Sequence, residues 1–204
     1  VEEAISHYTR SLEIKPDFAE AHNQMGNILL NQDKLDAAIE YYRKALAIMP
    51  ELASAHHNLG VALTKQGLEK EAIFHYQEAL RIDPNLAEAH NSMGNAYLKQ
   101  GRDDDAIAEY QKALSINPNY PEARFNLGTV LINHMRDSEA AIHLTEAVRL
   151  KPDHMDARRN LAIALINLGR PQDAIMQLNE LLRSQPGDRE AIKILRIARA
   201  RLKK

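Results

Sequence analysis

Six prolines recur at a fixed spacing of 34 residues and constrain the fold more than any other feature of this sequence. These ladder prolines are Pro16, Pro50, Pro84, Pro118, Pro152 and Pro186. A second position keeps the same period and is occupied by Gly26, Gly60, Gly94, Gly128 and, in the fifth place, Ala162. Self-similarity of this kind is typical of a stacked array, in which each unit buries its apolar face against its neighbours. The chain is therefore predicted to be a repeat array.

Apolar residues within each period recur at the i, i+3, i+4 and i+7 spacing that is typical of amphipathic helices. Each repeat is predicted to hold a first helix, a short turn and a second helix. The second helix should end before the ladder proline, because proline has no N–H and clashes with the preceding turn. A left-handed glycine is expected at the turn in three repeats, whereas Asp33 and Met135 replace it in the other two.

Two smaller patterns concern the ends and the interiors of the helices. Side chains that follow ladder prolines are predicted to cap the first helices, and one further residue is predicted to cap a last helix: Asp17, Asn85, Asn119, Asp153 and Asp188. The periodic glycines lie inside first helices, where glycine costs about 1 kcal/mol relative to alanine. Their recurrence predicts that another helix backbone passes close to them.

The period of 34 with this proline and glycine pattern, and with tyrosines at Tyr8, Tyr42, Tyr76 and Tyr110, resembles the tetratricopeptide repeat (TPR) family over essentially the whole chain. The resemblance implies an all-α fold, a right-handed TPR superhelix (α-solenoid) of antiparallel helix pairs. The expected divisions are the second helix of a truncated repeat at 1–18, complete repeats at 19–52, 53–86, 87–120, 121–154 and 155–188, and a basic C-terminal capping helix at 188–204. The cap should face repeat five with Ile192, Leu195, Ala198 and Leu202.

The charges are nearly balanced in total but unevenly distributed. The 204 residues carry 26 Lys+Arg and 28 Asp+Glu, a formal net charge of -2. Seven of the basic residues and one acidic residue, Glu190, lie in 189–204, which leaves +6 there and -8 in the remainder. No nucleic-acid partner is expected. The basic end predicts a polar cap for the array, with contact to an acidic partner or an anionic membrane surface as the alternative.

Composition also bears on the compartment. The chain has no cysteine, no apolar run of about 18 residues that would span a bilayer, and no signal-like start. A cytoplasmic location is expected, although the parent protein could be membrane-anchored. The sequence begins within a repeat, which predicts a fragment of a longer protein.

No motif for catalysis or for a cofactor is recognisable: there is no glycine-rich phosphate loop, no zincin pair and no CxxC. Among the nine histidines, His22, His56 and His90 share one repeat position. Packed helices lie about 8–10 Å apart, whereas zinc ligands lie about 2.0–2.1 Å from the metal. These histidines are therefore predicted to pack half-buried, and the chain is predicted to be non-catalytic, with no cofactor and no metal.

The inner face of the first helices is the expected site. In TPR arrays this face lines a concave groove, and the resemblance assigns it here to Asn23, Asn27, Asn58, Asn91, Asn95, Asn126, Asn160, Phe125, Arg159, Lys65 and Lys99. A side-chain amide offers both donors and an acceptor, so regularly spaced asparagines can bond the backbone of an extended peptide whatever its sequence. Phe125 and Arg159 would select side chains. A merely solvated helix face is the alternative interpretation.

One narrower resemblance concerns a single register of this face. Asn58, Asn126 and Asn160 resemble the asparagine ladder of O-GlcNAc transferase TPR regions. The segment Ala-His-Asn-Ser-Met-Gly-Asn at 89–95 is also similar to the repeats of that family. Gln24 and Ser92 interrupt the ladder, and no transferase domain is present in these 204 residues. The resemblance makes a glycosyltransferase a possible parent.

The chain lacks the cationic clamp that is typical of chaperone-binding TPR domains. Chaperone-binding TPR domains hold a C-terminal carboxylate with a clamp of lysines and asparagines. Here Asn23 and Asn91 occupy the lysine positions, and Glu88 or Asp156 occupies the later positive position. A carboxylate would meet amides and an acid instead of cations. A receptor for chaperone tails is therefore not predicted.

Three functions follow as hypotheses. The first is a non-catalytic scaffold that binds an extended peptide or a partner protein in its groove. The second is the substrate-recognition arm of a larger enzyme such as an O-GlcNAc-transferase-like glycosyltransferase. The third is a self-assembly module, a homo-oligomer formed through the terminal helices, because a second helix without its first helix leaves apolar surface uncovered.

Overall fold

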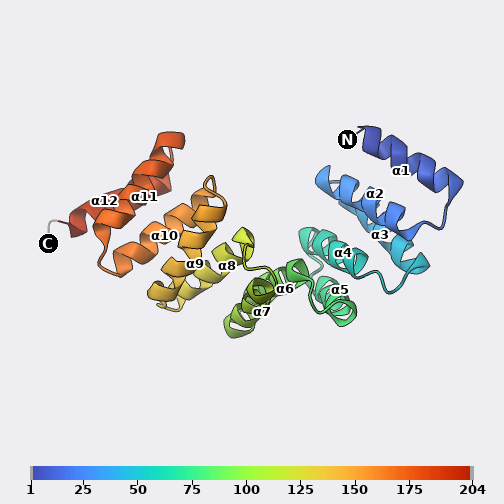
Figure 1. Ribbon diagram of the computed structural model, residues 1–204, viewed down its shortest axis with the longest axis horizontal. Coiled ribbons are helices and arrows are strands. Elements are labelled where there is room, and N and C mark those ends of the chain that lie inside the picture. The colour runs from blue at the N-terminus through green and yellow to red at the C-terminus, as the bar shows by residue number, and fades with distance from the viewer. Residues whose placement is uncertain (1, 203–204) are drawn as a thin grey trace. The chain divides into compact units, whose positions relative to one another are not determined.

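The computed structural model describes residues 2–202, and every secondary-structure element among them is an α-helix (Figure 1). The chain divides into two units, Val1–Gly101 and Arg102–Lys204. Unit 1 holds α1 (Glu2–Ile14), α2 (Ala19–Asn31), α3 (Leu35–Ile48), α4 (Ala53–Gln66), α5 (Glu69–Ile82) and α6 (Ala87–Lys99). Unit 2 holds α7 (Asp103–Ile116), α8 (Pro121–Asn133), α9 (Asp137–Leu150), α10 (Met155–Asn167), α11 (Pro171–Ser184) and α12 (Arg189–Arg201). The division falls between α6 and α7, inside the predicted repeat 87–120.

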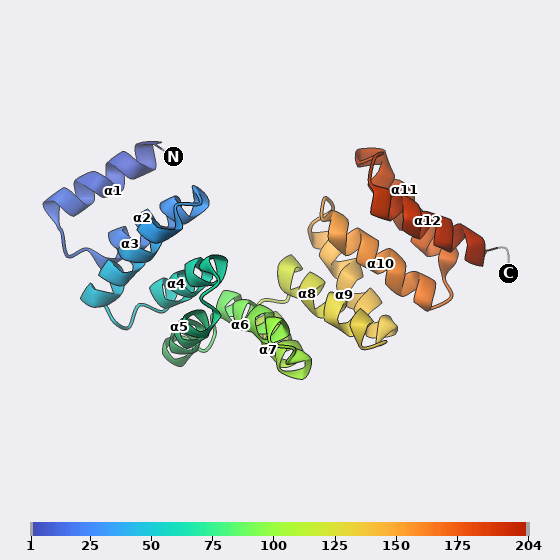
Figure 2. The same ribbon diagram turned by 180° about the vertical axis from the view of Figure 1, so that it is seen from behind.

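Within each unit, helices that follow one another pack together, as Figures 1 and 2 show. In unit 1, α2 pairs with α3 and α4 with α5; in unit 2, α8 pairs with α9 and α10 with α11. First helices also contact one another, α2 with α4 and α4 with α6 in unit 1, and α8 with α10 and α10 with α12 in unit 2. The predicted all-α fold of stacked helix pairs is confirmed.

In the pairs α2–α3, α4–α5 and α8–α9, the core places a large side chain of the second helix on a glycine of the first. Tyr42 is fully buried, and a Cβ added at Gly26 would lie 2.4 Å from its Cε1 atom. At Gly128 the corresponding atom is Cγ of Leu144, at 2.6 Å. The predicted close approach is real, but the approaching group is mainly a side chain. At Gly60 the added Cβ would lie 2.6 Å from Cε1 of Tyr76 and 3.1 Å from the backbone carbonyl oxygen of Ala72, so the predicted helix backbone is close there, beside the side chain.

The turns inside the helix pairs adopt the predicted left-handed conformation. Gly67, Gly101 and Gly169 have φ of 81°, 70° and 71°, and the two residues that replace glycine, Asp33 and Met135, have φ of 59° and 56°. A side chain in this region brings Cβ close to the following carbonyl oxygen, which costs about 1–2 kcal/mol. Asp33 is of a type that tolerates the conformation, whereas the long Met135 is not.

We expect Met135→Gly to raise the free energy of unfolding by about 0.5–1 kcal/mol, the strain relieved less the added flexibility of the unfolded chain. Met135 is 87% exposed, so little packing is lost. Urea unfolding followed by circular dichroism measures the change. Met135→Ala is the matched control, since it removes the side chain but keeps Cβ. If the glycine variant is no more stable than the alanine variant, the strain at this turn is negligible.

The capping prediction was wrong for the first helices. Their N-caps are Phe18, Leu52, Leu86, Tyr120 and His154. The predicted caps lie one residue earlier, in the turn, where the backbone N–H of Asn85 donates to Asp83 and that of Asn119 to Asn117. The prediction for the last helix is confirmed, because Oδ1 of Asp188 accepts from the Ala191 N–H at 2.9 Å.

The apolar face of α12 also differs from the prediction. Leu195 and Ala198 are buried as expected, but the other two buried residues are Ala191 and Ile194. Leu202 is 41% exposed and Ile192 is only half-buried. The buried set follows the i, i+3, i+4, i+7 rule from Ala191, one residue out of phase with the predicted start. The last two residues of the predicted basic cap, Lys203 and Lys204, lie outside the described residues.

Candidate functional site

The shared histidine position has a structural role that the sequence pattern did not reveal. Nε2 of His22, His56 and His90 lies 2.8, 3.0 and 3.0 Å from the carbonyl oxygen of the ladder proline six residues earlier. A carbonyl only accepts, so each Nε2 donates. In the next two repeats arginine replaces histidine, and Arg124 and Arg158 donate to Pro118 and Pro152 at 2.9 and 3.0 Å. This position therefore ties each first helix to the turn that precedes it.

One of these histidines has a second partner. Nδ1 of His56 and Nδ1 of His75, on α5, lie 3.0 Å apart. Because Nε2 of His56 donates to Pro50, its Nδ1 accepts, and His75 donates. Burial lowers the pKa of His75, and the neighbouring His56 lowers it further. The pair joins α4 to α5, and between residues 2 and 202 no three potential ligands of the His, Cys, Asp or Glu type converge on a metal position.

Three of the predicted asparagines of unit 1, namely Asn23, Asn27 and Asn58, bond to other side chains of the same unit. Asn23 is 5% exposed; its Nδ2 donates to Ser54 at 3.4 Å, and its Oδ1 accepts from Asn58 at 3.1 Å. Oδ1 of Asn27 accepts the buried hydroxyl of Tyr42 at 2.9 Å. The structure thus joins α2 to α4 through amides, and the Asn23 and Asn27 side chains serve the fold.

The rest of the unit 1 set varies in exposure. Asn91 is 7% exposed, whereas Asn95, Lys65 and Lys99 are exposed and Asn58 is half-buried. The two lysines make only loose ion pairs, Lys65 with Asp33 at 3.9 Å and Lys99 with Glu69 at 3.6 Å. Their ammonium groups stay available for another anion.

A histidine links two neighbouring first helices of unit 1. Nε2 of His57, on α4, lies 3.1 Å from the hydroxyl of Ser92 on α6. Burial lowers the pKa of His57, against the opposing charge of Glu88. The lowered pKa favours the neutral form of the imidazole, which adds a polar group to α4 beside α6.

Unit 2 brings Phe125 and Asn160 to half-buried positions on α8 and α10. Nδ2 of Asn160 donates to the Thr129 hydroxyl at 2.9 Å, which links the two helices. The Phe125 ring packs on His154 with ring centroids 4.5 Å apart. Asn126, in the same register as Asn58 and Asn160, is also half-buried. The bonds to the hydroxyls of Ser54, Ser92 and Thr129 were not predicted from the sequence, in which Ser92 was noted only as an interruption of the asparagine register.

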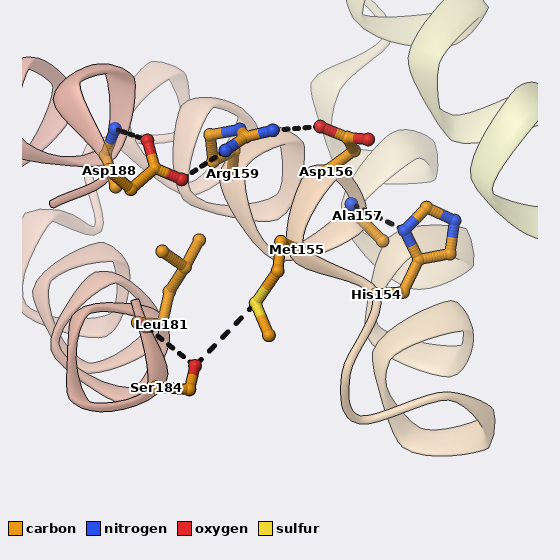
Figure 3. A network of polar contacts seen from close by, with 9 residues as sticks. His154, Met155, Asp156, Ala157, Arg159, Leu181, Ser184 and Asp188 are labelled. Atoms are coloured by element: carbon orange, nitrogen blue, oxygen red, sulfur yellow. Dashed lines mark hydrogen bonds and ion pairs between the residues drawn. The ribbon is translucent and has the colours of Figure 1, made fainter. Parts of the chain in front are cut away.

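Arg159 is not a free guanidinium. It donates to both Asp156 and Asp188, so it joins the start of α10 to the start of α12 (Figure 3). The side chain of Asp188 is 7% exposed and that of Arg159 is 23% exposed. The predicted role of Arg159 in selecting ligand side chains would require these ion pairs to open.

Sequence reasoning also missed an apolar hollow of about 800 Å³ between α9 and α11. Ile142 and Met176 line this hollow, and their side chains are 63% and 60% exposed. One signal was present in the sequence. At the register of Ala141 the other second helices carry isoleucine, namely Ile39, Ile73, Ile107 and Ile175. The short alanine side chain leaves this space unfilled.

Three family models match the chain. One, described as TPR repeat, matches residues 70–101 and 94–133, and two, described as tetratricopeptide repeat, match 17–85 and 136–197. Among curated proteins, none matches significantly. None of the helices described between residues 2 and 202 is long and apolar enough to span a membrane.

Solved structures agree with the family models. The chain is similar to YrrB, described as a TPR protein with an unusual peptide-binding site, at 25% identity over 91% of this chain and 96% of that one, with a TM-score of 0.69. It is also similar to PilF from Pseudomonas aeruginosa, at 22% identity over 94% and 87% and a TM-score of 0.85, and to MamA, at 23% over 82% and 92% and a TM-score of 0.67. With family models matched across 17–133 and 136–197, the chain belongs to the tetratricopeptide repeat family.

Proposed function

We propose that this protein is a non-catalytic scaffold whose two units each bind an extended segment of a partner protein along their first helices. The observation that carries the proposal is the register of Asn58, Asn126 and Asn160. All three side chains are half-buried, so each is held by its surroundings and still reaches the surface. An amide bonds a peptide N–H and C=O equally well, which suits a partner whose backbone is extended.

Two of these amides are pre-organised by bonds inside the protein. Asn58 donates one N–H to Asn23, and Asn160 donates one to Thr129. Each amide has a second N–H and a carbonyl oxygen in addition. A side chain that is already fixed loses less rotamer freedom when it binds, a saving of about 0.5–1.5 kcal/mol per side chain. The bonds inside the protein therefore favour binding.

The other predicted residues take different parts in this proposal. Asn23 would hold Asn58 in place through their hydrogen bond, and Asn27 and Asn91 would stabilise the first helices without contacting the ligand. Lys65, Lys99, Asn95 and Phe125 would meet ligand side chains, the lysines favouring acidic ones. Arg159 would act mainly by holding α10 and α12 together. The likeness to YrrB, whose structure is described by its peptide-binding site, supports a peptide ligand.

The test compares two triple variants on an array of unstructured peptides. The first changes Asn58, Asn126 and Asn160 to alanine. The matched control changes Gln77, Gln111 and Asn179, which are exposed, belong to one register of the second helices and are also amides. We expect the first variant to bind about tenfold or more weakly, because each hydrogen bond that it loses contributes about 1 kcal/mol or less. The control should bind like the wild type.

Helical content measured by circular dichroism accompanies the binding assay, because Asn58→Ala leaves the buried Oδ1 of Asn23 without its donor. Equal binding by both variants would refute the proposal for this register. A wild type that binds no peptide on the array would refute peptide recognition altogether.

The resemblance to O-GlcNAc transferase TPR regions extends the proposal to the recognition arm of a larger enzyme. The same asparagine register would then present a substrate protein to a catalytic domain. Reading the gene beyond residue 204 separates this alternative: a following glycosyltransferase domain supports it, and its absence from both sides removes it.

A further inference from the structure

The outward face of α12 differs from every other surface of the described chain in the state of its arginines. Outside α12, each arginine except Arg10 donates to a carboxylate or to a backbone carbonyl, as Arg43 does to Glu71 and Arg136 to Glu139. On α12, exposed Arg189, Arg196 and Arg199 make no such bond to the described residues. Positive charge therefore accumulates there without compensation.

These cations form one stripe along the helix. Arg189, Lys193 and Arg196 stand at i, i+4 and i+7, a spacing that aligns side chains on one helical face, and Arg199 extends the stripe by another turn. Their span along the axis is about 15 Å, at 1.5 Å per residue. The opposite face, Ala191, Ile194, Leu195 and Ala198, is buried against the rest of unit 2. Lys193 has only a distant partner, Glu190 at 3.8 Å.

The same face is unsuited to another helix pair of this array. Arg196 occupies the register of Gly26, Gly60, Gly94, Gly128 and Ala162. At Gly26, Gly60 and Gly128 a buried tyrosine or leucine of the second helix lies 2.4, 2.6 and 2.6 Å from the place where a Cβ would stand. The long side chain of Arg196 would occupy the space that a tyrosine or leucine of a following second helix needs. The outward face of α12 thus remains a surface for a different kind of partner.

We propose that the stripe of Arg189, Lys193, Arg196 and Arg199 docks an acidic segment of polypeptide that presents carboxylates along one side. Guanidinium groups match carboxylates in a bidentate geometry, and no carboxylate of the described chain competes for three of the four cations. Solubility needs only a polar surface, and charges paired within the chain, as they are elsewhere on this protein, would provide it as well. A helix that enters a lipid interface needs its apolar face free, and that of α12 is already buried.

The experiment measures fluorescence anisotropy of a labelled helical peptide of alanine and glutamate, with glutamates at i, i+4 and i+7. Its control is a scrambled peptide of the same composition. The test variant changes the four stripe residues to glutamine. The matched variant changes four exposed cations elsewhere, Lys34, Arg43, Lys70 and Arg183, to glutamine, so that both have the same net charge. Vesicles of phosphatidylserine are assayed in parallel.

The wild type is expected to bind the striped peptide and to lose affinity as salt rises, since exposed charges are screened. The stripe variant should bind about tenfold or more weakly, because four exposed ion pairs are removed, and the matched variant should bind like the wild type. Equal loss in both variants would overturn the proposal in favour of net charge. Binding to vesicles but not to the peptide, or to neither, would overturn it in favour of a lipid surface or a solvated cap. The stripe variant keeps Lys65, Lys99 and the three asparagines, so a loss of binding seen in this variant alone is independent of the first-helix peptide site.

Discussion

Gly26→Ala is expected to lower the free energy of unfolding by up to about 2 kcal/mol, although alanine is the better helix former. Its Cβ would lie 2.4 and 2.6 Å from two ring carbons of Tyr42, which is fully buried. Overpacking costs about 1–3 kcal/mol, and the helix propensity of alanine returns about 1 kcal/mol at most. The ring cannot move aside without breaking its hydrogen bond to Asn27.

The fifth repeat supplies the control for this prediction, since it carries Ala162 with Leu178 where the first carries Gly26 with Tyr42. Combining Gly26→Ala with Tyr42→Leu should therefore cost less than the sum of the two single changes. Urea unfolding of the four proteins in a double-mutant cycle measures this coupling, for which we expect about 1 kcal/mol or more. Additive effects would show that the glycine and the ring do not meet.

Asp188→Ala is expected to destabilise the C-terminal end of unit 2 by about 2–3 kcal/mol, because it removes two interactions together. One is the cap of α12, in which Asp188 accepts from Ala191, and the other is the ion pair with Arg159 (Figure 3). Asp188→Asn is the matched control, since an amide oxygen can still accept the cap bond. It should lose only the ion pair, about half of the effect.

The stability that the Asp188 carboxylate contributes is expected to depend on pH. The Ala191 N–H and the Arg159 guanidinium hold the pKa of Asp188 below its ordinary value, against the opposing effect of burial. A lowered pKa contributes stability that is fully present above the unfolded value of about 3.9, and that is lost as pH falls through the folded value. The difference in the free energy of unfolding between wild type and Asp188→Asn should therefore be constant near neutral pH and disappear at acidic pH.

Hydrogen exchange of the α12 amides reports both effects, because an end of a repeat array opens locally before the whole unfolds. If wild type and Asp188→Asn exchange alike at neutral pH, the ion pair stabilises nothing. If Asp188→Ala and Asp188→Asn exchange alike, the cap bond contributes nothing.

The helices, their pairing and their turns could be predicted from the sequence because each depends on local chemistry repeated every 34 residues. Proline ends a helix wherever it stands, and even the non-glycine left-handed residues Asp33 and Met135 were correctly placed at turns. The capping prediction failed because Asp17 and its equivalents lie only one residue from the N-cap, and a hydrophobic pattern does not resolve such a shift.

The candidate site was less predictable. The register identified first-helix positions, but whether an amide points to solvent or to its neighbour depends on rotamers and on the distance between helices. Asn23 and Asn58 carry the same side chain in adjacent repeats, yet Asn23 is buried and accepts a bond from Asn58. The sequence also did not predict that His56, and Arg124 in a later repeat, would donate to a proline carbonyl, because this contact depends on the conformation of the turn.

The most direct test of peptide binding along the first helices is the side-chain amide region of an ¹⁵N NMR spectrum, recorded with and without a peptide selected on the array. We expect the signals of Asn58, Asn126 and Asn160 to shift on binding, because their N–H groups would contact the ligand backbone. The signals of Gln77, Gln111 and Asn179, on the second helices, should stay in place. Shifts confined to the second-helix amides, with the three asparagines unchanged, would contradict the proposed site.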